Sequence, residues 1–438
     1  MSSPPPVVIL GAGLAGLGCA RELGRRALVL EREPRVGGMA RSVARGGFTF
    51  DRTGHWLHFA DRGTEVLARE LLGDGLERIA RRAAITSQGI TTPYPFQANT
   101  YGRPARVVAD CVLGYFRARE AAARGELPPP RNFEDHIRQH LGDGIARHFM
   151  VPYNTKLWTV PPAALDHAWC ERFVPTPTPD EVVRGALEPA GAGHGLGYNA
   201  SFLYPREGGI GALAEALRAS LAAEVRTGVT ATRVDWRART VETSAGERLG
   251  WRVLVSTAPL PDLVALLVDP PELVRAAARR LRAASVTYWD VGLPRANRPG
   301  DAHWTYFPDP DVPFYRAGSP SAVLPALAPP GHRSLYVEVS HPRGTPVPTT
   351  EAEVLRGLVA VGLVASDEEP VLMARETLDC AYVIMDAEYG GARRAILEWL
   401  ASEGILSVGR YGAWTYDSME GALVQGRRAA QQANELVS

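Results

Sequence analysis

Three glycines near the start of the chain have the spacing of a turn that can hold the diphosphate of a dinucleotide. Gly11, Gly13 and Gly16 come directly after the short apolar run 7–10, which reads VVIL. Runs of this kind are typical of a buried parallel strand. Gly11 permits a tight turn, Gly13 lets the backbone approach a pyrophosphate, and Gly16 lets the next helix pack against the strand. The pattern predicts a phosphate-binding turn between a strand and a helix.

Glu31 completes this pattern. It follows a second apolar strand expected over 27–30 and lies 20 positions after the first glycine. A carboxylate at this place can accept hydrogen bonds from both hydroxyls of an adenosine ribose. The helix expected over 13–23 turns its first N–H groups toward the diphosphate, and Leu14 and Ala15 lie in that first turn. A glycine-rich turn without a ligand does not explain Glu31, so we favour a dinucleotide site.

A second glycine pair favours FAD over NAD. The segment 31–42 reads EREPRVGGMARS, and its glycine pair ends at Gly38. This segment resembles the second diphosphate loop of the large family that contains amine oxidases, desaturases, protoporphyrinogen oxidases and sugar-nucleotide mutases. The resemblance implies that Arg41 faces the flavin diphosphate. It also implies that Met39 and Ala40 lie beside the cofactor.

The composition argues against several classes of protein. The chain has 438 residues, with 48 Lys and Arg against 48 Asp and Glu, so its formal net charge is zero. This length allows two or three domains, and the balanced charge argues against a nucleic-acid-binding surface. No apolar run is long enough to span a membrane, and the N-terminus lacks the pattern of a signal peptide. Four cysteines without a CxxC pair are typical of reduced thiols, so we expect a cytoplasmic protein.

The order of the patterns along the chain predicts an α/β protein with a discontinuous cofactor domain. We expect a Rossmann-like FAD-binding domain assembled from the segments 1–92, 201–284 and 400–438. A helical domain is inserted at 93–200, and the segment 285–399 is expected to form an antiparallel-sheet substrate domain. Helical spacing predicts helices at 64–72, 104–124, 133–141, 212–223 and 421–436, with Asn132 as the N-cap of the third.

Beyond the two glycine turns, a histidine is a candidate for chemistry at the cofactor. His55 lies in the segment 54–59, which reads GHWLHF. Beside a flavin, a glycine-flanked imidazole can contact the isoalloxazine and respond to its charge. The same residues also suit an ordinary turn in which the histidine packs in the core. Both interpretations stay open at this point.

The segment 152–158, PYNTKLW, has the densest mixture of polar and aromatic side chains. Tyr153 and Trp158 offer flat faces for a base or a sugar ring, and Lys156 offers a point charge for phosphate. Lys156 is also the only lysine of the chain. Arg316 ends the motif DVPFYR, and an arginine can fork onto a diphosphate. The alternatives are an aromatic helix cap in the core and a solvated surface arginine.

Together these segments resemble the flavin-dependent pyranose–furanose mutases of the UDP-galactopyranose mutase type. The motifs GHWLHF, YPFQANT, PYNTKLW, YPREGGIG, DVPFYR, AYVIMD and GRYGAWTYDSME follow one another over nearly the whole chain. PYNTKLW and DVPFYR are the motifs that separate this family from related oxidases. The resemblance implies a redox-neutral mutase that interconverts the pyranose and furanose forms of a nucleoside-diphosphate sugar. In that reaction reduced FAD forms a covalent adduct with the sugar.

The family pattern also implies roles for the matching residues. His55, beside the flavin, and Arg316, on the substrate diphosphate, are the expected catalytic residues. The expected cofactor-binding residues are Gly11, Gly13, Leu14, Ala15, Gly16, Glu31, Gly38, Met39, Ala40, Arg41, His55, Val229, Arg410, Asp417, Ser418 and Met419. The expected substrate-binding residues are Tyr153, Asn154, Lys156, Trp158, Arg172, Arg316, Tyr382 and Asp386. No metal site is expected, and the pattern is compatible with a homodimer.

Two departures from the family pattern leave the substrate open. Arg172 has no clean match as the second diphosphate-binding arginine, because a run of proline and threonine follows it. The turn around Gly38 looks more like that of the oxidases than that of the bacterial galactose enzyme. The sugar and the base are therefore not assigned. The alternative function is an FAD-dependent oxidase or desaturase of the amine oxidase or protoporphyrinogen oxidase type, and a flavin-free relative is a third interpretation.

Overall fold

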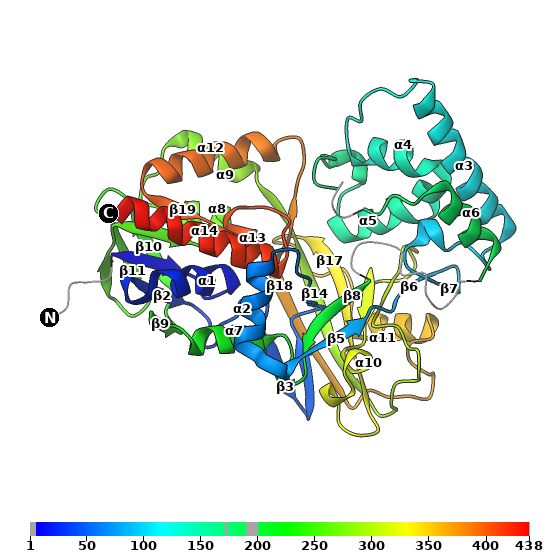
Figure 1. Ribbon diagram of the computed structural model, residues 1–438, viewed down its shortest axis with the longest axis horizontal. Coiled ribbons are helices and arrows are strands. Elements are labelled where there is room, and N and C mark those ends of the chain that lie inside the picture. The colour runs from blue at the N-terminus through cyan, green and yellow to red at the C-terminus, as the bar shows by residue number, and fades with distance from the viewer. Residues whose placement is uncertain (1–5, 171–173, 190–199, 438) are drawn as a thin grey trace.

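The structure of the chain is a computed structural model, and it describes residues 6–170, 174–189 and 200–437. Three parts can be followed in Figure 1. A parallel sheet with helices packed around it lies on the left, an antiparallel sheet lies at the lower right, and a group of helices lies at the upper right (Figure 1).

Five parallel strands form the first sheet, in the order β19-β13-β1-β2-β9. Their bounds are β1 Val7–Leu10, β2 Ala27–Glu31, β9 Glu224–Thr227, β13 Val253–Ser256 and β19 Ile405–Ser407. The strands β1, β2 and β13 are buried along their whole length, as expected for a parallel sheet covered on both faces. Three distant parts of the chain thus contribute to one sheet, which confirms the discontinuous Rossmann-like architecture. The individual domain boundaries stay a prediction.

Helices from both ends of the chain pack together on this sheet. A Cβ atom on Gly426 would lie only 2.2 Å from the carbonyl oxygen of Ala15, so the first and last long helices are in backbone contact. The helices of this part are α1 Leu14–Leu23, α2 Arg62–Leu72, α7 Gly211–Ala219, α8 Leu260–Leu266, α9 Glu272–Arg280, α12 Tyr389–Ser402, α13 Gly409–Gly412 and α14 Met419–Val437.

Small antiparallel sheets connect these elements. One is a hairpin of β3 and β4, another pairs β5 with β8, and a third joins β10, β11 and β12. The bounds of these strands are β3 Ser42–Arg45, β4 Phe48–Asp51, β5 Leu76–Ala80, β8 Ser201–Pro205, β10 Ala231–Asp235, β11 Thr240–Thr243 and β12 Arg248–Gly250.

The second large sheet has seven strands in the order β18-β14-β17-β16-β15-β6-β7. All neighbours are antiparallel except the pair β15 and β6. This confirms the expected antiparallel sheet but adds two strands from the first part of the chain, which the sequence did not place there. The bounds are β6 Ala83–Ser87, β7 Ile90–Pro93, β14 Arg282–Leu293, β15 Trp304–Tyr306, β16 Arg316–Gly318, β17 Arg333–Pro342 and β18 Leu372–Ile384.

The two faces of this sheet differ in chemistry. Along β14, Trp289 and Val291 belong to an apolar cluster with the helix α11, Glu351–Ala360. Tyr288 and Asp290 alternate with them along the strand and therefore face the opposite side. That opposite side is polar although it is buried. A helix of four residues, α10 Pro320–Val323, lies close to β17.

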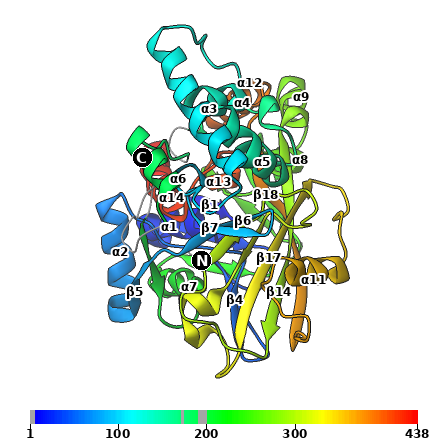
Figure 2. The same cartoon turned by 90° about the vertical axis from the view of Figure 1, so that its right-hand side faces the viewer.

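The inserted segment is mostly helical, as the sequence predicted. Figure 2 shows its helices above the strands β6 and β7. Asn132 caps α4, because its Oδ1 accepts the N–H of Asp135 at 2.9 Å. The helices are α3 Ala105–Ala123, α4 Phe133–Ile145, a π-helical turn Ala146–Met150, α5 Val151–Trp158 and α6 Pro179–Leu187.

Several helix ends differ from the expected ones. The helix expected over 212–223 ends at Ala219, because the hydroxyl of Ser220 donates to the carbonyl of Leu217 at 2.7 Å and the chain then turns into β9. Conversely, α2 begins two residues earlier than expected, because Asp61 accepts the N–H of Thr64 at 2.7 Å. Short 3₁₀ turns lie at Gly24–Arg26, Gly73–Gly75, Phe96–Ala98, Pro162–Ala164 and Pro325–Leu327.

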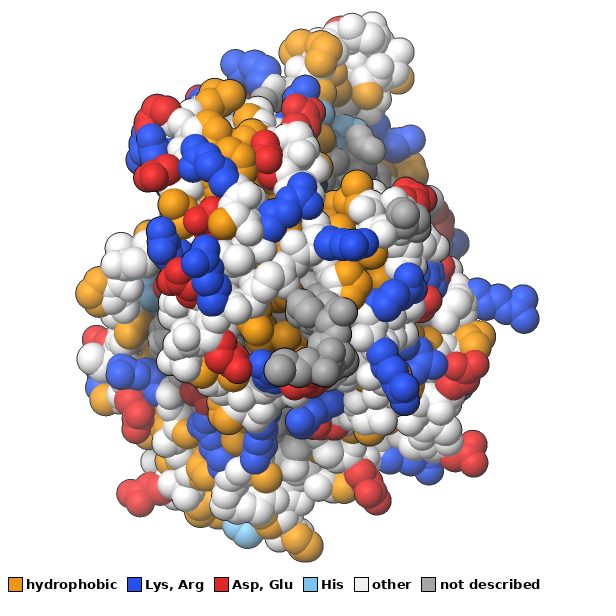
Figure 3. All heavy atoms as spheres, turned by 90° about the vertical axis from the view of Figure 1, so that its left-hand side faces the viewer, with side chains coloured by type: hydrophobic (Ala, Val, Ile, Leu, Met, Phe, Trp, Pro, Cys, Tyr) orange, Lys and Arg blue, Asp and Glu red, His pale blue; other side chains and the backbone are white. Residues whose placement is uncertain are grey.

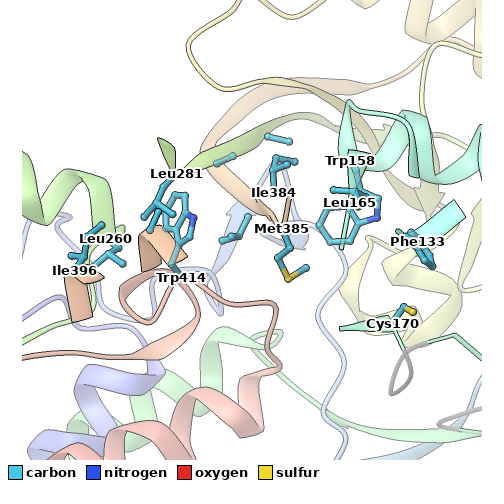
Figure 4. Close-up of a cluster of buried hydrophobic side chains, with 14 of the residues drawn as sticks. Phe133, Trp158, Leu165, Cys170, Leu260, Leu281, Ile384, Met385, Ile396 and Trp414 are labelled. Carbon is cyan, nitrogen blue, oxygen red and sulfur yellow. The ribbon is translucent and has the colours of Figure 1, made fainter. Parts of the chain in front are cut away.

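One apolar cluster runs from the inserted helices into the parallel-sheet part. Figure 4 shows Trp158 and Leu165 of the insert close to Ile384 and Met385 at the end of β18, with Trp414 beyond them. All of these side chains are buried. The two parts therefore share apolar packing, which fixes the insert relative to the turn that follows β19.

The surface is mixed in charge. In Figure 3 basic and acidic side chains alternate over the visible face, in agreement with a formal net charge of zero. No helix in the described part of the chain is long and apolar enough to cross a membrane. Within the described residues no cysteine forms a disulfide, and Cys380 is the least buried of the four.

A test of this packing uses two glycines in helices. A Cβ on Gly144 would lie 2.1 Å from the carbonyl oxygen of Asp110, whereas a Cβ on the exposed Gly391 would meet nothing within 4 Å. We expect Gly144→Ala to lower the free energy of unfolding by about 2 kcal/mol through overpacking of α3 against α4. Gly391→Ala should raise it by about 0.5 kcal/mol. Denaturant unfolding followed by circular dichroism measures both, and effects of the same sign would contradict the close helix contact.

Candidate active site

Two glycine turns cross at the carboxyl end of β1. The N–H of Gly37 donates to the carbonyl of Ala12 at 2.8 Å. A Cβ on Gly38, whose φ is +56°, would lie 3.2 Å from the Cα of Gly13. A side chain at this crossing would separate the two backbones. The crossing therefore leaves the free N–H groups of both turns close to one another, and such groups favour a phosphate.

The first turn of α1 is packed between two backbone segments. A Cβ on Gly16 would lie 1.9 Å from the carbonyl oxygen of Gly11. A Cβ on Gly409 would lie 2.8 Å from the Cβ of Ala15, and Leu14 and Ala15 are both buried. This packing fixes the N-terminus of α1, where the unpaired N–H groups and the helix dipole favour an anion.

Glu31 is held rigidly beside this turn. Its Oε2 accepts the N–H of Ala12 at 2.7 Å, and its Oε1 accepts the N–H of Glu33 at 2.9 Å. The N–H of Val229 donates to the carbonyl of Glu31 at 2.9 Å, so the loop after β9 lies next to the end of β2. A carboxylate oxygen has more than one acceptor site, so Glu31 retains the capacity to accept hydroxyl groups.

Two arginines flank the second glycine turn. Arg41 forms an ion pair with Glu33 at 3.2 Å, and Arg52 donates to the carbonyl of Gly38 at 3.4 Å. Within the described residues, the Nε atoms of both arginines are buried and have no hydrogen-bond partner. Buried donors of this kind need an acceptor, and guanidinium groups suit phosphate oxygens. These two side chains fit the diphosphate of a flavin dinucleotide.

The rest of the second turn supports this position. The N–H of Ala40 donates to the carbonyl of Gly37 at 2.9 Å and closes the turn. Met39 is half-buried and packs against an apolar cluster that includes Tyr288 and Tyr315 of the antiparallel sheet. The cofactor turn and the polar face of the sheet are therefore in contact.

His55 lies where the loop after β4 meets this sheet. A Cβ on the preceding Gly54 would lie 2.2 Å from the Oη of Tyr336, so the loop packs directly on β17. Within the described part of the chain, His55 Nδ1 is buried without a hydrogen-bond partner. Desolvation, together with the charges of Arg410 and Arg316, lowers the pKa of His55 to about 4. His55 is therefore a neutral imidazole at pH 7, close to two cations.

Arg410 is enclosed by carbonyl groups and aromatic rings. Its two terminal nitrogens donate to the carbonyls of Asp417 at 2.9 Å and Ala381 at 3.0 Å. Its guanidinium carbon lies 5.4 Å from the ring centre of Tyr382 and 4.7 Å from that of Tyr416. In the described ranges its Nε is buried without a partner and no carboxylate pairs with it. Arg410 therefore brings to the site a positive charge that carbonyls and ring faces stabilise and that no carboxylate of the described residues neutralises.

The turn before α14 carries three of the expected cofactor residues. Asp417 accepts the side-chain amide of Gln425 at 2.6 Å and the N–H of Ser418 at 2.8 Å. The hydroxyl of Ser418 accepts the N–H of Gly421 at 3.0 Å, and Met419 packs on the core of the parallel-sheet part. These bonds keep the 417–419 backbone at the N-terminus of α14.

A row of polar side chains crosses the antiparallel sheet next to His55. The strand register aligns one residue from each of five neighbouring strands, and all five face the same side. This row consists of Glu376, Tyr288, Glu338, Arg316 and Tyr306. The polar face noted above is therefore an ordered line of charged and phenolic groups.

Arg316 is fixed within this row by an ion pair. Its Nε donates to Glu338 Oε2, and its Nη2 donates to Glu338 Oε1 at 2.7 Å. The Glu338 side chain is 1% exposed, so the pair is shielded from water. Burial disfavours the charge, but the Glu338 carboxylate and neighbouring tyrosines hold the pKa of Arg316 well above its usual range. Arg316 stays a cation, and its Nη1 remains for an anion.

Aromatic rings from the insert and the sheet surround the two arginines. Tyr153 of α5 lies 5.1 Å from Tyr306 and 6.4 Å from Tyr315, as measured between ring centres. Trp158, one helical turn further, lies 5.5 Å from Tyr382. These distances are typical of edge-to-face packing. The structure thus brings together Tyr153, Trp158, Tyr382 and the arginines, all of which the sequence proposed as site residues.

Lys156 has internal partners in this structure, and its expected contact with phosphate stays a prediction. Its ammonium group donates to four backbone carbonyls at 2.7–2.9 Å, and an ammonium has only three N–H donors. All of its hydrogen-bonding capacity is therefore used inside the protein. The sequence could not reveal this, because the four carbonyls belong to a loop about 150 residues further along the chain.

Asn154 also has internal partners, and its expected contact with substrate stays a prediction. Its Nδ2 donates to the carbonyl of Met150 at 2.7 Å, and its Oδ1 accepts the indole N–H of Trp158 at 3.2 Å. Asn154 is buried. It therefore orients Trp158 and is a positioning residue.

Asp386 lies at the start of α12. One of its carboxylate oxygens accepts the N–H groups of Glu388 and Tyr389, both at 3.1 Å, and the other lies 3.5 Å from Arg282. This is the geometry of a helix cap. The expected contact of Asp386 with substrate stays a prediction, and Arg172 lies outside the described residues.

Three residues of the site were not expected from the sequence. Arg52 lies beside the glycine crossing, Glu338 anchors Arg316, and Tyr336 presents a buried hydroxyl without a partner in the described part of the chain. Glu338 interrupts the apolar alternation of β17, and a charge in a buried strand is a signal that could have been used. Among the described residues, no group of three or more His, Cys, Asp or Glu side chains could hold a metal ion.

A comparison of the sequence with models of known protein families shows the family to which the chain belongs. The family model for flavin-containing amine oxidoreductases matches residues 14–434. The chain belongs to this family. Its members are flavin enzymes, and the crossed glycine turns, Arg41 and Arg52 are the elements that suit the flavin dinucleotide.

Solved structures place the chain more closely within the family. It is similar to a reduced UDP-galactopyranose mutase, at 28% identity and a TM-score of 0.91, over 99% of this chain and 96% of that one. A CLA-producing fatty acid isomerase from P. acnes is 15% identical, with a TM-score of 0.65 and 99% of both chains covered. A redesigned putrescine oxidase is 16% identical, with a TM-score of 0.65 and 98% of both chains covered. The last two share the fold.

The ion pair in the polar row can be tested by substitution. Glu338→Gln removes the charge that compensates buried Arg316, so we expect it to lower the free energy of unfolding by about 3 kcal/mol. Glu242→Gln is the matched control, because Glu242 pairs with Arg233 on the surface at 3.2 Å and should contribute almost nothing. Denaturant unfolding measures both. Equal effects would mean that the Arg316–Glu338 pair is not shielded from solvent.

The pKa of His55 gives a prediction about pH. In the protein without flavin we expect His55 to titrate near pH 4, well below the ordinary value of 6.5. Between these pH values the unfolded chain binds a proton that the folded chain does not, so this histidine lowers stability as the pH falls. Histidine resonances followed by NMR give the value, and His55→Asn identifies the signal. Titration near 6.5 would contradict the buried position between two cations.

Proposed function

We propose that the protein is an FAD-dependent mutase that interconverts the pyranose and furanose forms of a nucleoside-diphosphate sugar. The observation that carries this proposal is a buried cluster in which Arg316 and Arg410 lie close enough to His55 to lower its pKa, among the rings of Tyr153, Tyr315 and Tyr382. The similarity to a UDP-galactopyranose mutase over nearly the whole chain supports it. The sugar and the base are not part of the proposal.

The residues present fit FAD. The crossed glycine turns and the N-terminus of α1 would receive the diphosphate, with Glu31 at the ribose. The Nε atoms of Arg41 and Arg52 are buried donors without an acceptor in the described part of the chain. The same holds for the Nε of Arg410, at the turn before α14. When bound in its reduced form, FAD would supply the nucleophile of a redox-neutral reaction.

The side chains of the site would bind and orient the substrate. Arg316 is the expected ligand of the substrate diphosphate, because its remaining N–H groups are held in place by Glu338. Tyr153 and Trp158 offer ring faces for the base or the sugar. The same rings exclude water, which strengthens the electrostatic attraction between the arginines and a diphosphate. His55, uncharged at neutral pH, would contact the cofactor without adding a third positive charge.

The alternative is an oxidase or desaturase that uses the same cofactor turns. The resemblance of the 37–42 turn to those of oxidases favours it, and a putrescine oxidase shares the fold. Such an enzyme would consume an electron acceptor at every turnover, whereas a mutase would not. We also propose that the protein forms a homodimer and is located in the cytoplasm.

The deciding experiment is an anaerobic incubation of the purified flavoprotein with UDP-, GDP- and dTDP-hexoses, with and without dithionite. We expect one donor to give an isomer of unchanged mass, detected by chromatography and mass spectrometry, only when the flavin is reduced. Oxygen consumption with amine or apolar substrates, together with no isomer from any donor, would contradict the mutase and favour the oxidase.

The role of Arg316 can be separated from its role in stability. Arg316→Lys keeps the positive charge beside Glu338 but loses the planar fork, so we expect the affinity for the nucleotide sugar to fall at least about tenfold. The flavin should remain bound, as judged by its absorption spectrum. Binding measured by calorimetry at wild-type affinity would remove Arg316 from the diphosphate site.

A further inference from the structure

Lys156 lies inside a ring of backbone carbonyls. Its ammonium group is half-buried and points from α5 into the loop that joins β15 to β16. All four acceptors come from this one loop of eight residues, 307–314. They are the carbonyl oxygens of Phe307 at 2.8 Å, Asp309 at 2.9 Å, Val312 at 2.8 Å and Phe314 at 2.7 Å.

This 307–314 loop connects residues of the polar row. Tyr306 precedes it, and Tyr315 and Arg316 follow it. The N–H of Phe307 donates to the carbonyl of Tyr315 at 2.9 Å, and the N–H of Tyr315 donates to the carbonyl of Glu338 at 3.1 Å. The position of the loop therefore sets the positions of the phenol and the guanidinium that border the proposed diphosphate site.

The outer side of the 307–314 loop is held independently. The carboxylate of Asp309 accepts the hydroxyl of Ser87 and the N–H of Gln88, both at 2.6 Å. The inner side has four converging carbonyl dipoles, and these repel one another unless a cation lies between them. In the described part of the chain, the Lys156 ammonium is the cation that forms hydrogen bonds with this ring.

We propose that Lys156 is a positioning residue whose ammonium group organises the 307–314 loop and thereby holds Tyr306, Tyr315 and Arg316 in place for the nucleotide sugar. The inference rests on the proposed function and deepens it. Lys156 lies between Tyr153 and Trp158 on α5, so one short helix carries both the aromatic faces and the cation that organises the diphosphate side. Lys156 thus adds a polar contact between the inserted helices and the antiparallel sheet to the aromatic contacts of Tyr153 and Trp158.

Losing the ammonium group of Lys156 differs from losing the volume of its side chain. A compact ammonium can meet four carbonyls at once, whereas methionine would fill the space without donating a hydrogen bond. Carbonyls left without a donor in a buried ring cost free energy, so the loop would shift to find water. The expected effect of losing the ammonium is therefore a displaced Arg316 rather than an unfolded protein.

The experiment compares Lys156→Met with Thr155→Ala in the flavin-loaded protein. Thr155 is the matched control, because it is the neighbouring residue of α5 and only donates to the carbonyl of Val151 at 2.8 Å. We expect Lys156→Met to weaken nucleotide-sugar binding by about tenfold or more, because a displaced Arg316 loses a charge-assisted hydrogen bond to the diphosphate. Flavin binding and kcat at saturating substrate should change little, and Thr155→Ala should leave affinity at the wild-type value.

A chemical rescue tests the role of the charge itself. Lys156→Ala leaves room for a small amine, so added ethylammonium should restore much of the lost affinity to this variant and none to Lys156→Met. Affinity that falls in Lys156→Ala and is not restored by ethylammonium would overturn the proposal in favour of simple packing. Wild-type affinity in Lys156→Met would overturn it as well.

Hydrogen exchange separates this inference from the proposed function. Amide exchange over the peptide that contains residues 307–314 should quicken in Lys156→Met and stay unchanged in Thr155→Ala, with no sugar present. If wild-type protein binds no nucleotide sugar while the exchange changes as expected, the proposed function fails and the loop-organising role stands. If the exchange is unchanged while wild-type protein binds the sugar, the positioning role is wrong.

The pH dependence gives one more readout. Desolvation lowers the pKa of Lys156 to about 7, against the opposing effect of Asp309 and Asp311, the charged groups on the loop packed against it. Above this pH a neutral amine has two N–H donors for four carbonyls. Affinity for the nucleotide sugar should therefore fall as the pH rises through about 7 in the wild type. Lys156→Arg stays charged, so its affinity for the nucleotide sugar should not fall in this pH range. The same fall in both proteins would contradict a role for the Lys156 charge.

Discussion

The burial of positive charge is the constraint on which this site depends. Arg316, Arg410 and Lys156 all lie largely away from water, where an uncompensated charge is very costly. The protein compensates each in a different way. A carboxylate pairs with Arg316, carbonyls and ring faces surround Arg410, and a ring of four carbonyls holds Lys156. Each form of compensation also fixes geometry, because the partners are backbone groups or strand residues that cannot easily move.

The three cations differ in what they can still bind. Lys156 has no donor left, so its effect is confined to the loop that it organises. Arg316 keeps part of its guanidinium, and the Nε of Arg410 has no partner among the described residues. The neutral state of His55 follows from the same constraint, since a third positive charge between the two arginines would be repelled. The site is therefore arranged to attract an anion of high charge.

The sequence predicted those features that depend on neighbouring residues. The glycine fingerprint, the first two strands and the Asn132 cap each involve contacts within a few tens of residues, and patterns of that range are visible in one chain. The parallel pairing of β6 with β15 and the partners of Lys156 were missed, because they join residues 150 or more positions apart. The internal partners of Lys156 were not foreseen for this reason. Its residue type suggests phosphate, and only the distant loop reveals that its donors are already used.

The charge of the site also bears on the choice between a mutase and an amine oxidase. In the described part of the chain, the buried carboxylate of Glu338 pairs with Arg316 and no carboxylate forms an ion pair with Arg410, so these two arginines near His55 carry an excess of positive charge. A diphosphate would compensate this excess, and its attraction would be strong in an environment without water. An amine substrate would add another cation to it. The cofactor turns are common to both kinds of enzyme, so the polar row of the antiparallel sheet is the part of this molecule that favours a nucleotide sugar.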